Sequence, residues 1–530
     1  MHKILISDKF DPEGVARLKE TDGIEVIYKG GHNREELIEA IGQANGLIIR
    51  SSSKVDAELL SRAPALKAVL RAGVGVDNID IPECSRRGII VMNAPGGNSV
   101  STAEHAISLM MALARNIPQA HASMKAGKWE KSKFSGIELT GKTLGVVGLG
   151  RIGKEVVKRA RGLKMNVIGF DPFIPPANLS SLEIEIVEKE RILKESDFIT
   201  VHTPLTDATR DFINKSNFSL LKKGVRLINC ARGGIYNEAD LQTGIESGII
   251  AGVALDVFST EPVPADFALR DHPAVVMTPH LGASTGDAEF AVAMETVDET
   301  VEFFQRGIAR NSLNFPTLDP ESLDFLKPFY EGGTRIGKLM SLALKGEVKD
   351  IQIIYYGEVA EYMTDPVKAA IIQGALIPSC GDEVNFVNAP YLARERSIQI
   401  TEEKDAESQD FSRAVRVRMT SSQGQLIQLT FTSIQKEPRI ISLFGLPLEF
   451  KPEGILLLVE NQDVPGVVGS IGTFLGGIQV NIASIELARE SAGQKAHCVI
   501  AVDQLLTAEQ LADFGRLNHI MRVEQIDLRA

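Results

Sequence analysis

The sequence of 530 residues is poor in cysteine and contains no long apolar run. Its four cysteines, Cys84, Cys230, Cys380 and Cys498, lie far apart and form no C-x-x-C pair. This spacing argues against a zinc site or a disulfide framework, and it favours a reducing compartment. No stretch approaches the ~18 consecutive apolar residues of a membrane span. We therefore expect no metal site and no membrane partner.

The sequence also lacks an excess of positive charge. Lys and Arg number 57 and Asp and Glu number 69, so the net charge is −12. Binding to nucleic acid or to an anionic membrane needs clustered positive charge, so this balance argues against both partners. The N-terminus, MHKILISDKFDPEG, is unlike a signal or transit peptide. We expect a cytoplasmic, globular protein with three to four domains of ~150 residues each.

The first part of the sequence alternates short apolar runs with amphipathic segments. The runs that predict buried strands are 3–7, 24–28, 46–50, 66–71 and 88–92. One of the intervening helices should begin at Asn33, where Glu36 lies three residues on and can complete a capping box. Such alternation predicts a parallel sheet with helices on both faces.

Residues 99–126 have a long helical pattern that Pro118 interrupts. Strands and helices then alternate again, and the predicted strands are 143–150, 165–171, 197–203, 225–231, 251–258 and 274–279. A long amphipathic segment at 287–307 follows the last of them. The spaced prolines of residues 311–329 predict a linker.

The pattern changes after this linker. Helices are predicted at 331–345 and 365–376, a strand at 351–359, and a Ser-Gln-Gly turn joins two further strands. The C-terminal segment is predicted to contain, in order, a strand (455–460), a helix (465–476), two strands (478–487 and 496–502), a helix (507–518) and a strand (521–528). This β-α-β-β-α-β order is ferredoxin-like.

A glycine-rich motif, GLGRIG (148–153), lies between a predicted strand and a predicted helix. The next strand ends at Asp171, which is 171 − 148 = 23 residues further on. A lone G-x-G-x-x-G is a weak signal, but this context is typical of a dinucleotide-binding site. Gly148 allows the tight turn, Gly150 lets the pyrophosphate approach the backbone, and Gly153 permits close packing of helix and strand. The alternative is a tight turn that binds no ligand.

Asp171 favours NAD over NADP. Its carboxylate can accept hydrogen bonds from the adenosine ribose hydroxyls, whereas a 2′-phosphate would meet a like charge there. The next residues, Pro172, Phe173 and Ile174, offer no compensating cation. The amides at the start of the helix supply donors for the phosphates.

Three ionisable residues follow predicted strands of one sheet: Arg232, Glu261 and His280. Residues beyond the carboxyl ends of parallel strands line the ligand crevice, so the three should converge there. His280 can accept a hydroxyl proton, Glu261 can orient the imidazole, and Arg232 can bind a carboxylate bidentately. Taken alone, each residue has an ordinary structural explanation, and the interpretation depends on their sharing one edge.

The segments GLGRIG, NCARGGI, ALDVFSTEP and PHLGAST resemble those of the D-isomer-specific 2-hydroxyacid dehydrogenases. RAGVGVDNID, NAPGGNS and GKWEKSKF narrow the resemblance to the members of this family that oxidise 3-phosphoglycerate. It extends over nearly the whole chain and is weakest between residues 320 and 450.

The resemblance implies an α/β fold with a discontinuous, flavodoxin-like substrate domain and a Rossmann-type NAD domain. An α+β intervening domain and a ferredoxin-like ACT domain follow. The implied boundaries are 1–98 with 287–315 for the substrate-binding domain, 99–286 for the NAD-binding domain, 320–450 for the intervening regulatory domain and 452–530 for the ACT domain.

The resemblance also implies which residues form the sites. The cofactor-binding residues would be Gly148, Gly150, Arg151, Ile152, Gly153, Asp171, Thr203, Cys230, Arg232, Asp256 and His280. Arg232, Glu261 and His280 would be catalytic. Arg50 and Arg71 both end predicted strands of the first domain, so they could bind the substrate phosphate, together with the backbone amides of Gly73, Val74 and Gly75 and the side chain of Asn98. Without the resemblance, the two arginines could equally be solvated strand ends. Many relatives have Thr where this chain has Val74, so a hydroxyl donor is missing at that position.

Lys131 and Lys133, beside Trp129, would reach the site of a neighbouring subunit if the resemblance holds, since the family implies a homo-oligomer, a dimer or a tetramer. Effector-binding positions match Asn461, Asp463 and Asn481. Backbone amides at the start of helix 465–476 could take the carboxylate of an L-serine effector. An Asp-x-Pro-Gly segment is, however, also an ordinary turn signal.

Three functions remain open at this point. The leading one is NAD-dependent oxidation of 3-phospho-D-glycerate to 3-phosphohydroxypyruvate, the first step of L-serine biosynthesis. A glyoxylate or hydroxypyruvate reductase of the same family would share the catalytic residues but would not need Arg50 and Arg71 for a phosphate. A non-enzymatic, NAD-sensing corepressor belongs to a different class, and the complete set of catalytic residues argues against it.

Overall fold

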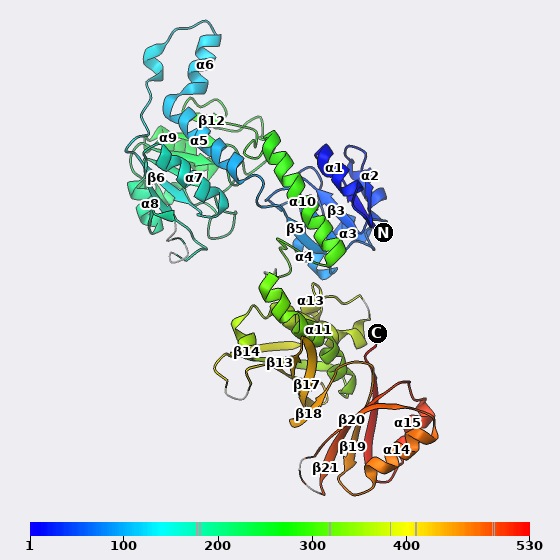
Figure 1. Cartoon of the computed structure of the whole chain (residues 1–530). Coiled ribbons are helices and arrows are strands. Elements are labelled where there is room, and N and C mark those ends of the chain that lie inside the picture. The colour runs from blue at the N-terminus through cyan, green and yellow to red at the C-terminus, as the bar shows by residue number, and fades with distance from the viewer. Residues whose placement is uncertain are drawn as a thin grey trace.

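The computed structural model describes residues 1–175, 179, 182–316, 320–381, 383–408, 411–489, 491 and 493–529. It contains four sheets, of five, seven, six and four strands. Each sheet with its helices is called a unit below, numbered one to four in the order in which the sheets begin along the chain (Figure 1). The first and second units are α/β, so the predicted fold class is confirmed for this part of the chain.

The first unit has a parallel sheet in the order β2-β1-β3-β4-β5. Its strands are β1 (His2–Ile6), β2 (Ile24–Ile27), β3 (Gly46–Ile49), β4 (Ala68–Arg71) and β5 (Ile90–Asn93), and its helices α1 (Pro12–Lys19), α2 (Arg34–Ile41), α3 (Ala57–Ser61), α4 (Ile81–Arg86) and the distant α10 (Gly286–Arg306). The order 2-1-3-4-5 is that of a flavodoxin-like sheet, as predicted. The capping box of Asn33 and Glu36 is also confirmed.

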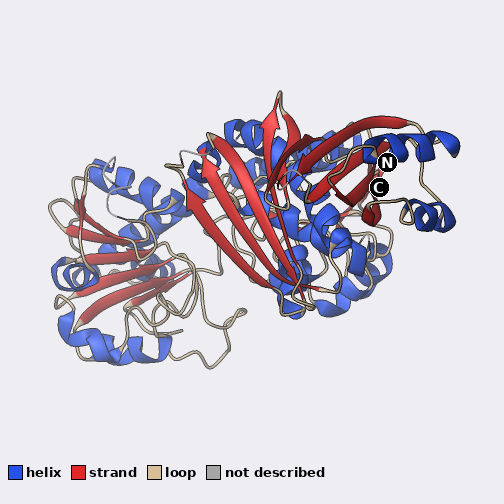
Figure 2. Cartoon of the chain, turned by 90° about the horizontal axis from the view of Figure 1, so that it is seen from below, coloured by secondary structure: helices blue, strands red, loops and turns tan. Residues whose placement is uncertain are grey.

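The second unit has a parallel sheet in the order β12-β11-β10-β9-β6-β7-β8. Its strands are β6 (Thr143–Val147), β7 (Asn166–Phe170), β8 (Glu185–Ile186), β9 (Phe198–Val201), β10 (Val225–Asn229), β11 (Ile250–Leu255) and β12 (Val275–Met277). Its α-helices are α5 (Ser99–Arg115), α6 (Ile117–Lys125), α7 (Arg151–Gly162), α8 (Lys189–Glu195) and α9 (Glu238–Glu246). Helices other than α6 cover both faces of the sheet (Figure 2). This is the predicted Rossmann order with one added edge strand.

The predicted interruption of helix 99–126 lies two residues before Pro118. Asn116 has a left-handed backbone conformation (φ 52°) and separates α5 from α6. Pro118 then occupies the first turn of α6, where the missing amide hydrogen breaks no helical hydrogen bond. No residue of α6 is buried, and the helix projects away from the second unit (Figure 1).

Two chain segments connect the first and second units, at 94–98 and 282–286. Helix α10 holds the first of them, because Glu295 Oε2 accepts hydrogen bonds from the amides of Gly96 (2.9 Å) and Gly97 (3.1 Å). The hydroxyls of Ser101 and Thr285 lie 2.7 Å apart and join the two segments. The two crossings are therefore linked to each other and to α10.

The third unit has a mixed sheet in the order β14-β13-β15-β16-β17-β18. Its strands are β13 (Val348–Gly357), β14 (Gln399–Asp405), β15 (Arg413–Ser421), β16 (Leu426–Ile434), β17 (Glu437–Leu443) and β18 (Leu446–Phe450), and its α-helices α11 (Pro320–Ala343), α12 (Asp365–Cys380) and α13 (Ala389–Glu395). The linker prediction was wrong beyond residue 320, because α11 begins there. Pro320 is tolerated at a helix start, and Leu326 and Phe329 are buried in the core of the unit.

The fourth unit is the predicted β-α-β-β-α-β unit, with sheet order β20-β21-β19-β22. Its elements are β19 (Ile455–Gln462), α14 (Val467–Gly477), β20 (Ile482–Arg489), β21 (Lys495–Val502), α15 (Ala508–Phe514) and β22 (Ile520–Asp527). Along β19, Leu457 and Val459 pack under the helices of this unit, whereas Leu456 and Leu458 belong to the core of the third unit. Strand β19 is therefore buried on both faces of the sheet. Within the described ranges, no helix is long and apolar enough to cross a membrane.

Helices α11 and α12 approach so closely that their backbones touch at two glycines. A Cβ on Gly337 would lie 2.1 Å from the carbonyl oxygen of Ile371, and one on Gly374 would lie 1.9 Å from that of Thr334. Backbone atoms cannot yield as the end of a side chain can, so a methyl group at either site would separate the helices.

We predict that Gly337→Ala lowers the free energy of unfolding by roughly 1–3 kcal/mol through overpacking. The matched control is Gly472→Ala in α14, where a Cβ meets nothing within 4 Å. This change should be neutral or should stabilise the protein by roughly 0.5–1 kcal/mol. Urea unfolding followed by circular dichroism measures both. Equal shifts in the two variants would contradict the close-packing explanation.

Candidate active site

The three predicted catalytic residues lie beyond the carboxyl ends of neighbouring strands of the second unit. Arg232 follows β10, Glu261 follows β11 and His280 follows β12, and these strands are parallel neighbours. The structure therefore brings the three residues to one edge of the sheet, although 48 residues (280 − 232) separate the first from the last.

His280 and Glu261 form an ion-pair geometry. His280 Nδ1 lies 2.7 Å from Glu261 Oε2, and the other carboxylate oxygen accepts the amide hydrogen of Phe258 at 3.0 Å. A carboxylate can only accept, so Nδ1 is the donor of this hydrogen bond, and in the neutral imidazole Nε2 keeps its lone pair. The imidazole is half exposed (51%), and Nε2 is therefore the atom that can exchange a proton with a ligand.

Asp256 shapes the loop that carries His280. This carboxylate is fully buried and accepts hydrogen bonds from the amides of Leu281 and Gly282, both at 2.8 Å, and from the Thr278 hydroxyl at 2.6 Å. Burial alone would raise the pKa of Asp256, but the hydrogen bonds from His105 and Thr278 outweigh burial and lower it. A charged Asp256 therefore holds the loop, and its predicted contact with the cofactor stays a prediction.

Arg232 reaches across to the first unit. Its Nε donates to Asp77 Oδ2 at 2.9 Å, and its Nη1 donates to the carbonyl oxygen of Ala231 at 2.7 Å. A Cβ on Gly75 would lie 2.0 Å from Arg232 Nη2, so the loop after β4 has no side chain where the guanidinium lies. Sequence reasoning missed Asp77, although it stands in the RAGVGVDNID segment, because a loop acid gives no sign of its partner.

Arg71 lies beside Arg232, as expected for a residue at the end of β4. Burial lowers the pKa of Arg71 to about 10, and the guanidinium groups of Arg232 and Arg50 add to this decrease. Its Nη1 donates to the carbonyl oxygen of Ala72 (3.0 Å), and its Nε is buried without a hydrogen-bond partner among the described residues. A Cβ on Gly73 would lie 1.5 Å from Arg71 Nη1, so this glycine makes room for the side chain.

The other predicted substrate-binding residues lie around this group. Arg50 pairs with Glu289 of α10 at 3.0 Å, and its backbone amide donates to Asp8. The Oδ1 atom of Asn98 is buried and has no partner among the described residues. Val74 contributes a backbone carbonyl that accepts from Asn93 at 2.7 Å. Arg50, Arg71 and Arg232 thus lie close enough for their charges to act on one another, which suits a ligand with several negative charges.

The glycine-rich turn has the geometry of a dinucleotide site. A Cβ on Gly153 would lie 2.0 Å from the carbonyl oxygen of Gly148, so helix and strand touch there. Gly150 has open space where a Cβ would be, and it precedes α7 without a side-chain cap. The first amides of α7 are therefore available to phosphate oxygens. Arg151, which begins α7, is exposed, and Ile152 packs against the core of the second unit.

Asp171 follows β7 and closes the same turn. Its Oδ2 accepts from the amide of Leu149 at 2.7 Å, and its Oδ1 accepts from the amides of Phe173 (2.8 Å) and Ile174 (2.9 Å). Each carboxylate oxygen has two lone pairs, so acceptor capacity remains for ribose hydroxyls. These residues fit a bound dinucleotide.

Two further predicted cofactor residues lie at the ends of β9 and β10. The Oγ1 atom of Thr203 is buried and has no hydrogen-bond partner within the part of the chain that the structure describes. A bound ligand could supply this partner. Cys230 is buried, and burial raises the pKa of its thiol, so the thiol is neutral; its contact with the cofactor stays a prediction.

The predicted effector residues are not brought together within one chain. Asn461 is buried on β19, and Asp463 pairs with Arg489 at 3.1 Å. Asn481, directly before β20, donates a hydrogen bond to Asp503 at 2.7 Å. Asn461 and Arg489 lie at the same level of the sheet, because both are opposite Ala496 of β21. Asn481 precedes the other end of β20, which is seven residues (489 − 482) away. At ~3.3 Å per residue this is roughly 23 Å. A site that uses all three residues needs two chains.

Comparisons with known proteins agree with this geometry. Residues 107–282 match the family model of the D-isomer specific 2-hydroxyacid dehydrogenase, NAD binding domain, and residues 325–444 match that of the D-3-phosphoglycerate dehydrogenase intervening domain. The chain is 39% identical to D-3-phosphoglycerate dehydrogenase of Bacillus subtilis over 100% of both chains. It is 38% identical to that of Methanocaldococcus jannaschii, also over 100% of both.

The chain belongs to the D-3-phosphoglycerate dehydrogenase family. Solved structures match a shorter part of it. The TT0316 protein from Thermus thermophilus is 31% identical with a TM-score of 0.54, and the match covers 59% of this chain and 99% of that one. A glyoxylate reductase from Paecilomyes thermophila is 27% identical with a TM-score of 0.53 and covers 59% and 98%. Membership in the family makes the second unit an NAD-binding unit of an oxidoreductase.

We predict that His280→Ala lowers kcat by roughly 10²–10⁴-fold, the usual contribution of a general acid–base group. NADH affinity, measured by fluorescence titration, should stay near that of the wild type. The matched control is His121→Ala, which replaces an exposed histidine of α6 and should leave both quantities unchanged. A His280→Ala enzyme with normal turnover would refute this role.

We also predict that Asp171→Asn weakens the preference for NAD over NADP. The substitution removes the negative charge but keeps an acceptor for the amides of Phe173 and Ile174. The ratio of kcat/KM for NAD to that for NADP should fall at least roughly tenfold, since one charge-assisted hydrogen bond and one repulsion are lost. An unchanged ratio would show that the charge of Asp171 does not select the cofactor.

Proposed function

We propose that this protein oxidises 3-phospho-D-glycerate to 3-phosphohydroxypyruvate with NAD, the first step of L-serine biosynthesis. The observation that carries the proposal is the cluster of Arg50, Arg71 and Arg232 at the cleft, in which Arg71 is buried beside like charges. A ligand with a carboxylate and a phosphate compensates these charges, whereas a monocarboxylate leaves part of them uncompensated.

The proposed mechanism assigns one task to each side chain. Arg232 binds the carboxylate and polarises the C2 oxygen, while Asp77 fixes its Nε. The free Nε2 of His280 accepts the proton of the C2 hydroxyl, and Glu261 stabilises the imidazolium that forms. The amides at the start of α7 and the carboxylate of Asp171 would hold NAD, which would supply the acceptor for the hydride of C2. Arg71 and Arg50 hold the phosphate, and Arg50 exchanges its contact with Glu289 for this ligand.

The division of labour among the units is part of the proposal. Residues 1–98 and 287–315 form the substrate-binding domain and residues 99–286 the NAD-binding domain. Residues 320–450 form an intervening regulatory domain and residues 452–530 an ACT domain. The strand orders of the four sheets and the matched intervening domain support this assignment.

We also propose a cytoplasmic homo-oligomer, a dimer or a tetramer, with L-serine as a possible effector between ACT domains. The arm that contains α6 supports subunit contact. Trp129 is 81% exposed there, and Ile117 and Met124 are more than half exposed, which suits a buried position against a second chain. The separation of Asn481 from Asp463 supports an effector site shared by two chains.

The experiment is to follow NADH formation with 3-phosphoglycerate and NAD, and then with D-glycerate, which lacks the phosphate. We expect efficient turnover of the phosphorylated substrate. Arg71→Ala should lower kcat/KM for 3-phosphoglycerate at least roughly tenfold more than for D-glycerate, because the lost bonds are charge-assisted. Turnover of glyoxylate with NADH but none of 3-phosphoglycerate would favour a reductase, and inactivity with both would favour a sensor.

A further inference from the structure

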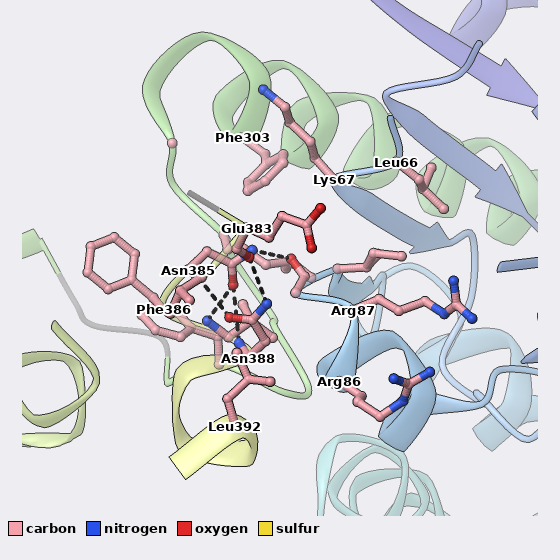
Figure 3. A pocket seen from close by; sticks show the side chains of 18 of the residues that line it. Leu66, Lys67, Arg86, Arg87, Phe303, Glu383, Asn385, Phe386, Asn388 and Leu392 are labelled. Carbon is pink, nitrogen blue, oxygen red and sulfur yellow. Dashed lines mark hydrogen bonds between the residues drawn. The ribbon is translucent and has the colours of Figure 1, made fainter. Parts of the chain in front are cut away.

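A cavity of about 1190 Å³ lies between the first and third units (Figure 3). One wall comes from the α3–β4 and α4–β5 connections and the end of α10. The other comes from the α12–α13 connection and α13 itself. Typical small-molecule sites have ~300–1,000 Å³, so the cavity has room for a whole metabolite.

The two walls are joined by the side chain of Asn385, whose amide group forms hydrogen bonds on both sides. Asn385 Nδ2 donates to the carbonyl oxygen of Gly88 at 2.9 Å, and its Oδ1 accepts from the amides of Val387 and Asn388. Asn388 Oδ1 in turn accepts from the amide of Asn385 at 2.7 Å (Figure 3). A Cβ on Gly88 would lie 2.1 Å from Asn385 Nδ2, so the contact depends on a glycine. The cavity is therefore bounded by a specific contact between the two units.

The charge of the lining is opposite to that of the protein. The chain has a net charge of −12, yet the described residues that line the cavity include five cations and one carboxylate, that of Glu383. Arg86 and Arg87 both pair with Glu83. Lys67, Arg306 and Arg396 form no ion pair with any residue that the structure describes. The lining thus leaves three cations for an anion.

Arg396 is the most informative of these cations. Its Nη1 donates to the Cys380 thiol at 2.8 Å, and sulfur is a weak acceptor. A guanidinium has five N–H donors in a fixed fork that matches a phosphate or a carboxylate. Arg396 is exposed, lines the cavity and has no strong acceptor among the residues that the structure describes.

The same cavity has an aromatic wall. The ring of Phe386 lies 6.2 Å from that of Phe315 and 6.2 Å from that of Tyr330, and Phe303 contributes a fourth ring on the side of the first unit. Partly exposed rings of this kind can pack against a flat apolar ligand. Cations and rings together define the chemistry of a ligand with an anionic end and an aromatic body.

We propose that this cavity is a binding site, separate from the catalytic cleft, for a small metabolite with a phosphate group on an aromatic body. Lys67, Arg306 and Arg396 bind the phosphate, and Phe386 packs against the aromatic body. Because the ligand contacts both units, it stabilises their relative arrangement. Its binding is thereby coupled to the first unit, which also carries Arg50 and Arg71 of the active site. None of the proposed catalytic residues lines the cavity.

The experiment uses the full-length protein and 1-naphthyl phosphate, with inorganic phosphate and 1-naphthol as partial ligands. Isothermal titration is done at saturating NADH, so that the dinucleotide site is filled. We expect one 1-naphthyl phosphate per chain, bound more tightly than either partial ligand. Arg396→Gln should weaken this binding at least roughly tenfold, as expected for loss of a charge-assisted contact. Phe386→Leu should weaken 1-naphthyl phosphate but not inorganic phosphate.

The matched control is Arg394→Gln, two residues earlier in α13, because Arg394 lies over Tyr391 and does not line the cavity. It should leave the affinity unchanged. Arg71→Ala should also retain the binding, since the catalytic phosphate site is not involved, and this result stands whether or not 3-phosphoglycerate is the substrate. Absence of binding heat, equal effects of the Arg394 and Arg396 variants, or loss of binding in Arg71→Ala would each overturn the proposal.

Discussion

The active site depends on two arginine side chains that lie against the loop after β4. They fit there because the loop has glycine at the two positions that the guanidinium groups contact. Arg71 and Arg232 come from different units, and Gly73 and Gly75 leave the space that their guanidinium groups fill. Burial of a cation beside like charges is unfavourable unless an anion compensates it. Asp77 compensates part of this charge through Arg232, and a doubly anionic substrate can compensate the remainder. This arrangement of charge favours a ligand with more than one negative charge.

The same interaction connects recognition with catalysis. The Arg232–Asp77 pair joins the loop after β4 to the loop after β10, so the residue that would bind the substrate carboxylate also joins the two units. Opposite it, Asp256 holds the backbone of residues 281 and 282, and His280 keeps a left-handed conformation (φ 56°) in which Nδ1 meets Glu261. The orientation of His280, the proposed general base, thus depends on Asp256, whose buried side chain binds the loop and not the His280 imidazole.

The third and fourth units form a second body of a different kind. Their cores are shared, because alternate residues of β19 face opposite sides of the sheet. The third unit also meets the first through Asn385 and Gly88, beside the cationic cavity. The match to the TT0316 protein covers 59% of this chain, whereas the match to the Bacillus subtilis relative covers all of it. The cavity and the active site lie at opposite ends of the first sheet, since Lys67 precedes β4 and lines the cavity, whereas Arg71 ends this strand.

The sequence by itself determined the features that depend on local pattern. Strands and helices of the first two sheets, the capping box at Asn33, the glycine turn of residues 148–153 and the ferredoxin-like order all follow from periodicity and turn residues. The edge that brings Arg232, Glu261 and His280 together follows as well, since parallel strands end on one side. Strand β14 was missed because its charged residues, QITEEKD, have no apolar alternation.

Only the tertiary structure decided which distant segments meet. It paired Arg232 with Asp77, which is 155 residues away, and Arg50 with Glu289. It also placed Asn481 at the opposite end of the sheet from Asp463. The two residues are close in sequence, but helix α14 between them carries the chain back along the sheet before β20 begins. The cavity beside Asn385 likewise has no local signature, because its walls come from elements that are about 300 residues apart and no local pattern records their contact.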